Sequence, residues 1–359
     1  MAAPAAGAAK LDPATAQRLD RALDETLAKI AAPGAAVGVW VGDKGWTAVR
    51  GTTKRGERRT PTLADHTRIG SITKTFTGTL VLQLVDEGKL KLDETIQKWF
   101  PLAPEAGKIT IRDLGAMSSG INTYVADKTI SDRYLDDPTQ AWKPEELIDA
   151  GVGLPRTFAP GHGFFYSDTN TLMLGQIVED VTGKPIGKVL RERIFAPLKL
   201  RGTSFPATSK IPAPYWNGYT NQNATGTRLR DTTDWSPTFA GAAGQAVSTL
   251  PDLHRWAVVL GTGSLLSPGA QRDRLKPNPA SVGGGREYDF CLGRDHGWLT
   301  HVGDIPGYNS QIAYLPKKKA TIVVLVNTDI ESHQALPAPL ITTALSEVIA
   351  PANITTGTH

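Results

Sequence analysis

The feature that most constrains the fold is the position of the strand patterns, which gather near the two ends of the chain. The segment AAVGVWVGDKGWTAVRG (35–51) contains the turn residues Gly-Asp-Lys-Gly at 42–45 and predicts a β-hairpin. A second hairpin is predicted from QIAYLP (311–316) and TIVVLVNTD (321–329). Strands at both ends with helices between them imply one sheet built from the two termini.

Apolar residues at helical spacing occupy most of the remaining chain. They predict helices at 13–30, 72–87, 110–117, 144–150, 169–182, 186–195 and 338–350. We therefore predict an α+β fold, an α/β sandwich whose central antiparallel sheet comes from both chain ends and is flanked by helices. The sheet domain would comprise 1–75 and 241–359, with 1–12 as a flexible tail, and a mostly helical domain would be inserted at 76–240. The active site is expected in the cleft between these two domains.

Composition excludes several classes of protein. With 40% hydrophobic and 21% charged residues, the 359-residue chain has the proportions of a soluble globular protein. The net charge is +4, and the longest basic run (317–319) lies between two predicted strands, where it reads as a solvated hairpin tip. Nucleic acid is therefore not an expected partner. No apolar run reaches the ~18 residues that a membrane span needs.

Cysteine and histidine usage gives no support for a metal or other cofactor, and none is expected. The single cysteine, Cys291, excludes an internal disulfide, and its apolar, strand-like surroundings (YDFCLGR) predict a buried, inert thiol. The seven histidines show no metal-ligand spacing. The N-terminal MAAPAAGAAK is not an intact signal peptide but resembles the spacer after a removed one, so we expect an exported bacterial protein. A cytoplasmic protein with a frayed end is the alternative.

Ser71 and Lys74 lie three residues apart at the start of the predicted helix 72–87. At a helix N-terminus, free backbone N–H groups favour developing negative charge on the serine. Lys74 lies one turn further, so its amine can return to the same face. Burial and the positive helix end are expected to lower the pKa of the lysine and make a neutral amine accessible as a base. The alternative is a serine that only caps the helix.

Two further segments carry candidate residues. PGHGFFYSDTN (160–170) places Tyr166 beside turn residues, where its hydroxyl could reach a cleft and share proton transfer. WLTHVGDIPGY (298–308) places His301 on a strand, with Gly303 allowing another part of the chain to approach closely. Taken singly, Tyr166 also fits an ordinary half-buried aromatic residue, and His301 a structural histidine.

Taken together and in this order, the motifs Ser-Ile-Thr-Lys (71–74), Tyr-Ser-Asp (166–168) and His-Val-Gly (301–303) resemble the serine β-lactamase and penicillin-binding-protein superfamily. The likeness is greatest to its class C β-lactamase and D-Ala-D-Ala carboxypeptidase branch. Recurring segments of that family are resembled by TRIGSITKTF, LVDEGKLKLDETIQKWFP, TIRDLGAMSSGI, APGHGFFYSDTN, GAAGQAVSTLPDLHRW and HVGDIPGYNSQIAYLP. The resemblance covers roughly residues 35 to 345.

The resemblance implies a role for each candidate. Ser71 would attack a carbonyl carbon and form an acyl-enzyme, while Lys74 and Tyr166 would take up and return the proton. The backbone amides of Ser71 and Asp304 would form the oxyanion hole. His301 would line the cleft opposite the serine and contact the substrate's carboxylate or polar end.

Two positions depart from the family pattern. Asp168 stands where this branch usually has asparagine, and His301 stands where class C β-lactamases have lysine. An ionised aspartate only accepts hydrogen bonds, so it disfavours a substrate carbonyl there. It could instead pair with Lys74 or bind a substrate ammonium group. A neutral imidazole also holds a carboxylate less firmly than an ammonium group does.

We therefore expect a metal-free serine hydrolase acting on a D-amino-acid peptide, amide or ester, with a small molecule or peptide as its partner. The D-Ala-D-Ala carboxypeptidase type and a promiscuous carboxylesterase of the same fold remain alternatives within the enzyme class. A non-catalytic penicillin-binding or sensor protein is the alternative from another class. The sequence does not assign an oligomeric state.

Overall fold

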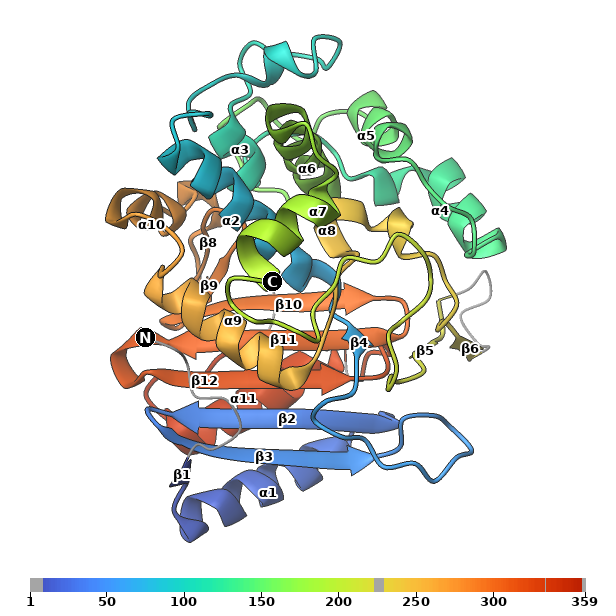
Figure 1. Ribbon diagram of the computed structural model, residues 1–359, viewed down its shortest axis with the longest axis vertical. Helices are drawn as coiled ribbons and strands as arrows, with labels where there is room; N and C mark the ends of the chain where they lie inside the picture. The colour runs from blue at the N-terminus through green and yellow to red at the C-terminus, as the bar shows by residue number, and fades with distance from the viewer. Residues whose placement is uncertain (1–8, 223–228, 333, 357–359) are drawn as a thin grey trace.

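A computed structural model describes residues 9–222, 229–332 and 334–356. In this part of the chain, eight strands form one sheet in the order β1-β3-β2-β12-β11-β10-β9-β8 (Figure 1). The strands are β1 (Ala9–Lys10), β2 (Gly34–Val41), β3 (Lys44–Gly51), β8 (Arg286–Tyr288), β9 (Gly293–Asp295), β10 (Trp298–Ile305), β11 (Tyr308–Leu315) and β12 (Ala320–Val326). All neighbours are antiparallel except β1 and β3. The predicted sheet from both chain ends is thus confirmed, and β12 joins the two halves by pairing with β2.

Helices lie on both faces of this sheet. They are α1 (Pro13–Leu27), α2 (Thr73–Asp86), α3 (Ile111–Gly115), α4 (Lys128–Asp136), α5 (Pro144–Gly153), α6 (Asp168–Thr182), α7 (Ile186–Leu190), α8 (Gly241–Gly244), α9 (Leu250–Thr262), α10 (Pro268–Arg274) and α11 (Pro337–Ile349). Each predicted helix is present with shifted ends, whereas α4, α8, α9 and α10 were not predicted. Two short ladders lie outside the main sheet, β4 (Thr67–Arg68) with β7 (Val247–Ser248) and β5 (Tyr219–Thr220) with β6 (Arg230–Asp231).

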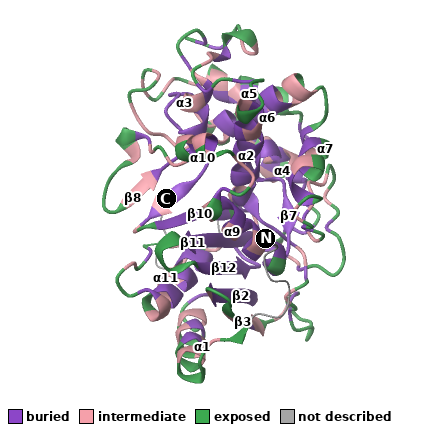
Figure 2. Cartoon of the chain, turned by 60° about the vertical axis from the view of Figure 1, so that its left-hand side comes forward, coloured by how far each residue is buried: buried purple, intermediate pink, exposed green. Residues whose placement is uncertain are grey.

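The sheet separates two hydrophobic cores. Alternate residues of a strand point to opposite faces, so Val323 packs toward α9 and the helical layer while its neighbour Val324 packs toward α1 and α11. Burial on both faces explains why β12 is apolar along its whole length, and Figure 2 shows the central strands buried. Burying each Val or Leu side chain stabilises the fold by about 1.5–3 kcal/mol.

Helix α2 runs through the helical layer and is buried round most of its circumference. It contacts α6, α7, α8 and α10, and its buried side chains include Phe76, which stacks on Trp256 of α9 at a ring-centroid distance of 4.1 Å. Such burial on nearly every side is typical of a helix in a protein interior. The residues immediately before α2 are therefore held in place from several sides.

The N-terminal segment and the cysteine differ from expectation. Of the predicted flexible tail, residues 1–8 lie outside the described part of the chain, but β1 pairs in parallel with β3 at the sheet edge, because its backbone groups can extend the ladder. Cys291 lies in the turn between β8 and β9 with a φ of 53°, so the strand-like interpretation was wrong. Its thiol is buried as predicted, and burial raises its pKa to about 12.

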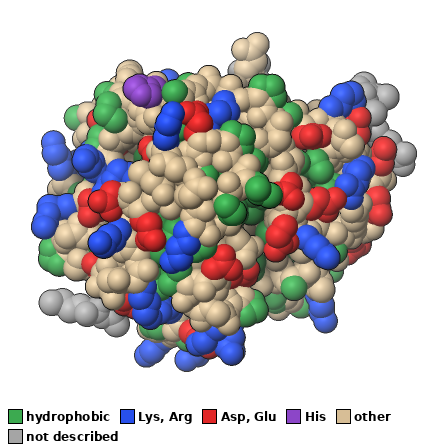
Figure 3. Space-filling model, turned by 90° about the horizontal axis from the view of Figure 1, so that it is seen from above, with side chains coloured by type: hydrophobic (Ala, Val, Ile, Leu, Met, Phe, Trp, Pro, Cys, Tyr) green, Lys and Arg blue, Asp and Glu red, His purple; other side chains and the backbone are tan. Residues whose placement is uncertain are grey.

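The surface seen from above carries basic and acidic side chains interspersed with one another (Figure 3). The tip between β11 and β12 holds the basic run 317–319, as predicted. Among the described residues, no helix is both long and apolar enough to span a bilayer. The division into a sheet domain and a helical domain, and export from the cell, stay predictions.

Candidate active site

Ser71 lies in a single 3₁₀ turn (Gly70–Ile72) that leads directly into α2, rather than within the first turn of the α-helix. The edge of β10 runs against this turn. A Cβ atom placed on Gly303 would lie 1.9 Å from the carbonyl oxygen of Ile69, and Ser310 Oγ donates a 3.0 Å hydrogen bond to the same oxygen. The close approach predicted at Gly303 is therefore present, and it brings β10 to the candidate nucleophile.

Lys74 is fully buried in the first turn of α2. Its ammonium donates to Ser71 Oγ at 2.8 Å and to the carbonyl oxygen of Ala243 at 3.0 Å. It also forms an ion pair of 2.5 Å with Asp168 Oδ1. An ammonium group has three N–H donors, and each of the three has an acceptor here.

The pKa of Lys74 moves in the direction opposite to our expectation. Burial acts to lower it, but the carboxylate of Asp168 and the hydroxyl of Tyr166 outweigh burial and raise the pKa above its ordinary value. The predicted neutral amine is therefore wrong for the ligand-free site. The cause is Asp168, which is distant in sequence and adjacent in space.

Tyr166 brings its hydroxyl to the same place. The hydroxyl shares hydrogen bonds with Ser71 and Lys74, and Lys74 Nζ lies 4.9 Å from the centroid of the phenol ring. Burial raises the pKa of Tyr166, although the charge of Lys74 opposes this. The phenol consequently keeps its proton near neutral pH, as an acid that can donate to a departing group does.

Asp168 is the first residue of α6, where the helix N-terminus favours a carboxylate. Its side chain is 25% exposed, whereas that of its partner Lys74 is 0% exposed. The pairing with Lys74 that the sequence left open is thus present. The aspartate is also the member of the pair that a solute can reach.

His301 is completely buried on the strand face that carries Gly303. Its Nδ1 lies 2.7 Å from the carbonyl oxygen of Val302, which only accepts, so Nδ1 carries a hydrogen. Its Nε2 lies 3.3 Å from the hydroxyl of Tyr288. Both ring nitrogens therefore have protein partners, and the predicted contact with a substrate stays a prediction.

The backbone of Asp304 faces the nucleophile. Ile305 and Tyr308 pair across a two-residue turn, and hydrogen-bonded pairs alternate along an antiparallel ladder, so the N–H of Asp304 points away from β11. Its nitrogen lies 2.7 Å from the place where a Cβ on Gly70 would stand. The amides of Ser71 and Asp304 are thus close neighbours, as an oxyanion hole requires. The side chain of Asp304 is exposed.

Two contributors to the site were not predicted. The carbonyl of Ala243 holds Lys74 from α8, and Tyr288 from β8 packs edge-on against Tyr166 at 5.9 Å between ring centroids. The segment GAAGQAVSTLPDLHRW already resembled the family and could have indicated the first. The tyrosine follows a glycine-rich run without periodicity, and the sequence held no signal for it.

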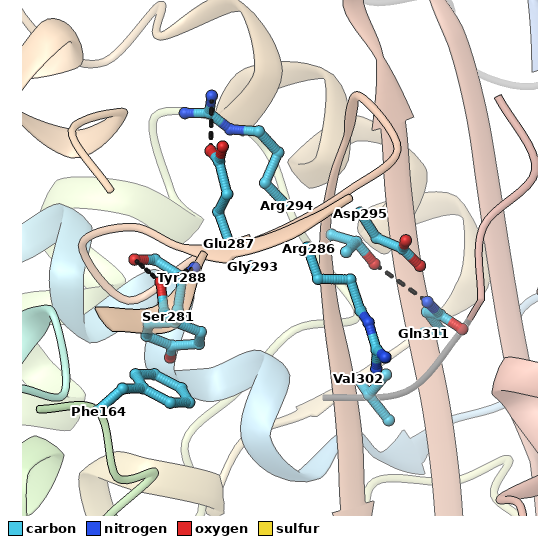
Figure 4. Close-up of a pocket in the computed structure, with 11 residues that line it drawn as sticks. Phe164, Ser281, Arg286, Glu287, Tyr288, Gly293, Arg294, Asp295, Val302 and Gln311 are labelled. Atoms are coloured by element: carbon cyan, nitrogen blue, oxygen red, sulfur yellow. Dashed lines mark hydrogen bonds and ion pairs between the residues drawn. The ribbon is translucent and has the colours of Figure 1, made fainter. Parts of the chain in front are cut away.

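A small cavity is lined by Tyr288 (Figure 4), the residue that packs against Tyr166. Phe164 and Val302 also line it, as do Gln311 and Thr300. The side-chain amide of Gln311 donates a 3.1 Å hydrogen bond to Thr300 Oγ1. Its volume of about 60 Å³ has room for a few water molecules and not for a substrate side chain. Outside this cavity, the side chain of Asp168 is partly exposed and Asp304 is exposed, so a solute can reach both residues.

A serine, a lysine and a tyrosine that share hydrogen bonds before a buried helix, beside the edge of an antiparallel sheet, define a member of the serine β-lactamase and penicillin-binding-protein superfamily. The chain belongs to its β-lactamase family of hydrolases, whose profile matches residues 19–344.

Named relatives fall into two groups. Penicillin-binding protein 4 of Amycolatopsis lactamdurans is 27% identical over 288 residues, which are 77% of this chain and 73% of that protein. A D-stereospecific amidohydrolase from Streptomyces sp. has a structure that matches with a TM-score of 0.81 and 29% identity, covering 95% of this chain and 99% of that one. The structure of the D-amino acid amidase from Ochrobactrum anthropi SV3, in complex with L-phenylalanine amide, matches with a TM-score of 0.81 and 25% identity. The match covers 94% of this chain and 98% of that one.

Proposed function

We propose that this chain is a serine hydrolase that cleaves D-amino-acid amides or short D-peptides through an acyl-enzyme on Ser71. The observation that carries the proposal is the 2.8 Å hydrogen bond between Ser71 Oγ and Lys74 Nζ, inside a cluster that also holds Tyr166 and Asp168. The likeness to a D-stereospecific amidohydrolase and a D-amino acid amidase supports the substrate class.

The proposed reaction uses these contacts in sequence. Ser71 Oγ attacks the carbonyl carbon, and its proton passes to Lys74 once the lysine is neutral. The amides of Ser71 and Asp304 stabilise the oxyanion. When the C–N bond breaks, the departing nitrogen takes a proton through the hydroxyl of Tyr166. Water then attacks the ester on Ser71 with the same proton acceptors and releases the carboxylic acid.

The likeness to penicillin-binding protein 4 favours a second candidate, a D-Ala-D-Ala carboxypeptidase type that is acylated by penicillin on the same serine. Two features weigh against it. Asp168 opposes the carbonyl of an N-acylated substrate, and the buried His301 replaces the lysine that would hold a substrate carboxylate.

The test compares hydrolysis of D- and L-phenylalanine amide, a D-Ala-D-Ala peptide, p-nitrophenyl acetate and a chromogenic β-lactam. The variants are Ser71→Ala and, as a matched control, Ser264→Ala, which removes an exposed hydroxyl. We expect the D-amide to be the best amide substrate, with activity lost in Ser71→Ala and kept in Ser264→Ala. A fluorophosphonate probe should label Ser71. Ammonia release that survives Ser71→Ala would refute the proposal, and a preference for the peptide or the β-lactam would favour the second candidate.

A further inference from the structure

The ion pair between Lys74 and Asp168 presents a difficulty for the proposed reaction. In the ligand-free site the lysine carries its proton, and its three N–H donors are taken up among four oxygen partners, those of Ser71, Ala243, Asp168 and Tyr166. A protonated amine cannot accept the proton of the serine hydroxyl. Tyr166 is no substitute, because burial raises its pKa and keeps it protonated. Some event must therefore separate Lys74 from its counter-ion before catalysis.

The exposed fractions indicate where that event occurs. Lys74 is unreachable at 0% exposure, but the Asp168 side chain is 25% exposed. Among the described residues, its carboxylate pairs with Lys74 alone. A cation arriving from solvent can thus bind the aspartate from its open side, and the lysine cannot leave. The carboxylate would then be shared with, or transferred to, the incoming cation.

The distances suit one kind of cation. Lys74 Nζ lies 2.5 Å from Asp168 Oδ1 and 2.8 Å from Ser71 Oγ, so these two oxygens are less than about 5.3 Å apart. In an α-amino amide, the nitrogen lies about 2.5 Å from the carbonyl carbon, given standard bond lengths. With the carbon in contact with Ser71 Oγ, the α-ammonium group comes within hydrogen-bonding reach of Asp168. An N-acyl group in the same place would bring a carbonyl oxygen against the carboxylate, which is repulsive.

We propose that Asp168 selects substrates with a free α-ammonium group, and that binding of this group releases Lys74 from its ion pair so that it can act as the base for Ser71. The inference rests on the proposed function and extends it. The second positive charge disfavours the charged form of Lys74, whose proton passes to the partly exposed carboxylate of Asp168 and from there to solvent. The neutral amine then takes the proton of Ser71 as the C–O bond forms. Uncharged or N-acylated amides lack this trigger and leave the lysine protonated.

The first test measures kcat/KM for ammonia release from D-phenylalanine amide, N-acetyl-D-phenylalanine amide and 3-phenylpropanamide. We expect the wild type to prefer the free amine by about 100-fold or more over both neutral amides. Asp168→Asn should reduce that preference at least about tenfold by slowing the free amine and not the neutral amides, and Asp168→Glu, which keeps the charge, should restore part of it. Equal rates in the wild type, or an equal loss for all three amides in Asp168→Asn, would overturn the inference while leaving the proposed function intact.

The second test needs no substrate. It follows the rate of Ser71 phosphonylation by a fluorophosphonate against pH, in the wild type and in Asp168→Asn. The groups that face Lys74 are Ser71 in the 3₁₀ turn, Tyr166 before α6, Asp168 in α6, the carbonyl in α8 and, more distantly, Cys291 between β8 and β9. Of these groups, only Asp168 is changed in the variant. The pH range in which the labelling rate of Ser71 rises should therefore move to lower pH by about one unit or more. If the labelling rate rises over the same pH range in both proteins, the release of Lys74 is refuted. If the probe does not label Ser71 at any pH, the proposed function is refuted as well.

Discussion

The close contact between β10 and the 3₁₀ turn that contains Ser71 makes Gly303→Ala the most demanding test of the site geometry. The new Cβ would lie 1.9 Å from the Ile69 carbonyl oxygen and 2.4 Å from Ser310 Oγ, whereas real Cβ atoms essentially never approach closer than 3.0 Å. The strand and the turn must therefore separate by about 1.1 Å. That movement also breaks the hydrogen bond from Ser310 to Ile69.

Two magnitudes follow from this separation. Misplacing reacting groups by about 1 Å lowers the rate about 100-fold. Overpacking costs about 1–3 kcal/mol, and the lost hydrogen bond about 1 kcal/mol more, so Tm should fall by roughly 3–5 °C in a chain of 359 residues. The assays are fluorophosphonate labelling of Ser71, amide turnover and scanning calorimetry.

Gly153→Ala is the matched control, because a Cβ there meets nothing within 4 Å. It should keep both activity and Tm. If Gly303→Ala labels at the wild-type rate with an unchanged Tm, the approach of β10 to Ser71 is not what positions the oxyanion hole, and the reasoning fails.

Further predictions concern single side chains. Tyr166→Phe should lower kcat for amides by about 10²–10⁴-fold, through loss of proton delivery to the departing nitrogen; an equal loss with an activated ester, which needs no such proton, would contradict this role. Tyr288→Phe removes the hydroxyl at His301 Nε2 and should lower the unfolding free energy by about 1 kcal/mol, measured in urea. His254 stacks on Trp40, and burial lowers its pKa to about 4. In the unfolded chain the pKa of this histidine is about 6.5, so its neutral form stabilises the folded state fully above that pH. This stability is lost as pH falls toward 4, and the loss reaches about 2–3 kcal/mol at pH 4.5. In His254→Phe, the unfolding free energy measured in urea should depend less on pH between 7.5 and 4.5. A pH dependence as strong as in the wild type would contradict this role of His254.

The sequence indicated the parts of the fold that carry strong local signals. The strands β2, β3, β11 and β12 combine apolar runs with turn residues, and α2 and α6 have long apolar periodicities, so their existence was predictable. The strands β8 and β9 have three residues each and owe their conformation to pairing, β9 with β10 and β8 with β9. The sequence around them therefore contains too little periodicity to recognise.

The candidate site shows the same division. Ser71, Lys74 and Tyr166 were found by motif, and the structure brings them together. The charge state of Lys74 was not predictable, because its determinant is a carboxylate on another helix and not the local helix end. Burial alone lowers the pKa of a lysine, but neighbouring charges can reverse that shift, and neighbours are a property of the tertiary structure.

The contact between the turn before α2 and β10 also has a consequence for how activity arises during folding. Ile69 and Ser310, which meet in this contact, are 241 residues apart in the chain. The loop that must close between them is long, and contacts of such sequence separation form late and slowly. The candidate nucleophile and the proposed oxyanion hole therefore come together only when the two ends of the polypeptide have met. Refolding chains should regain reactivity toward a fluorophosphonate in the slowest kinetic phase, which makes active-site labelling a reporter of completed topology.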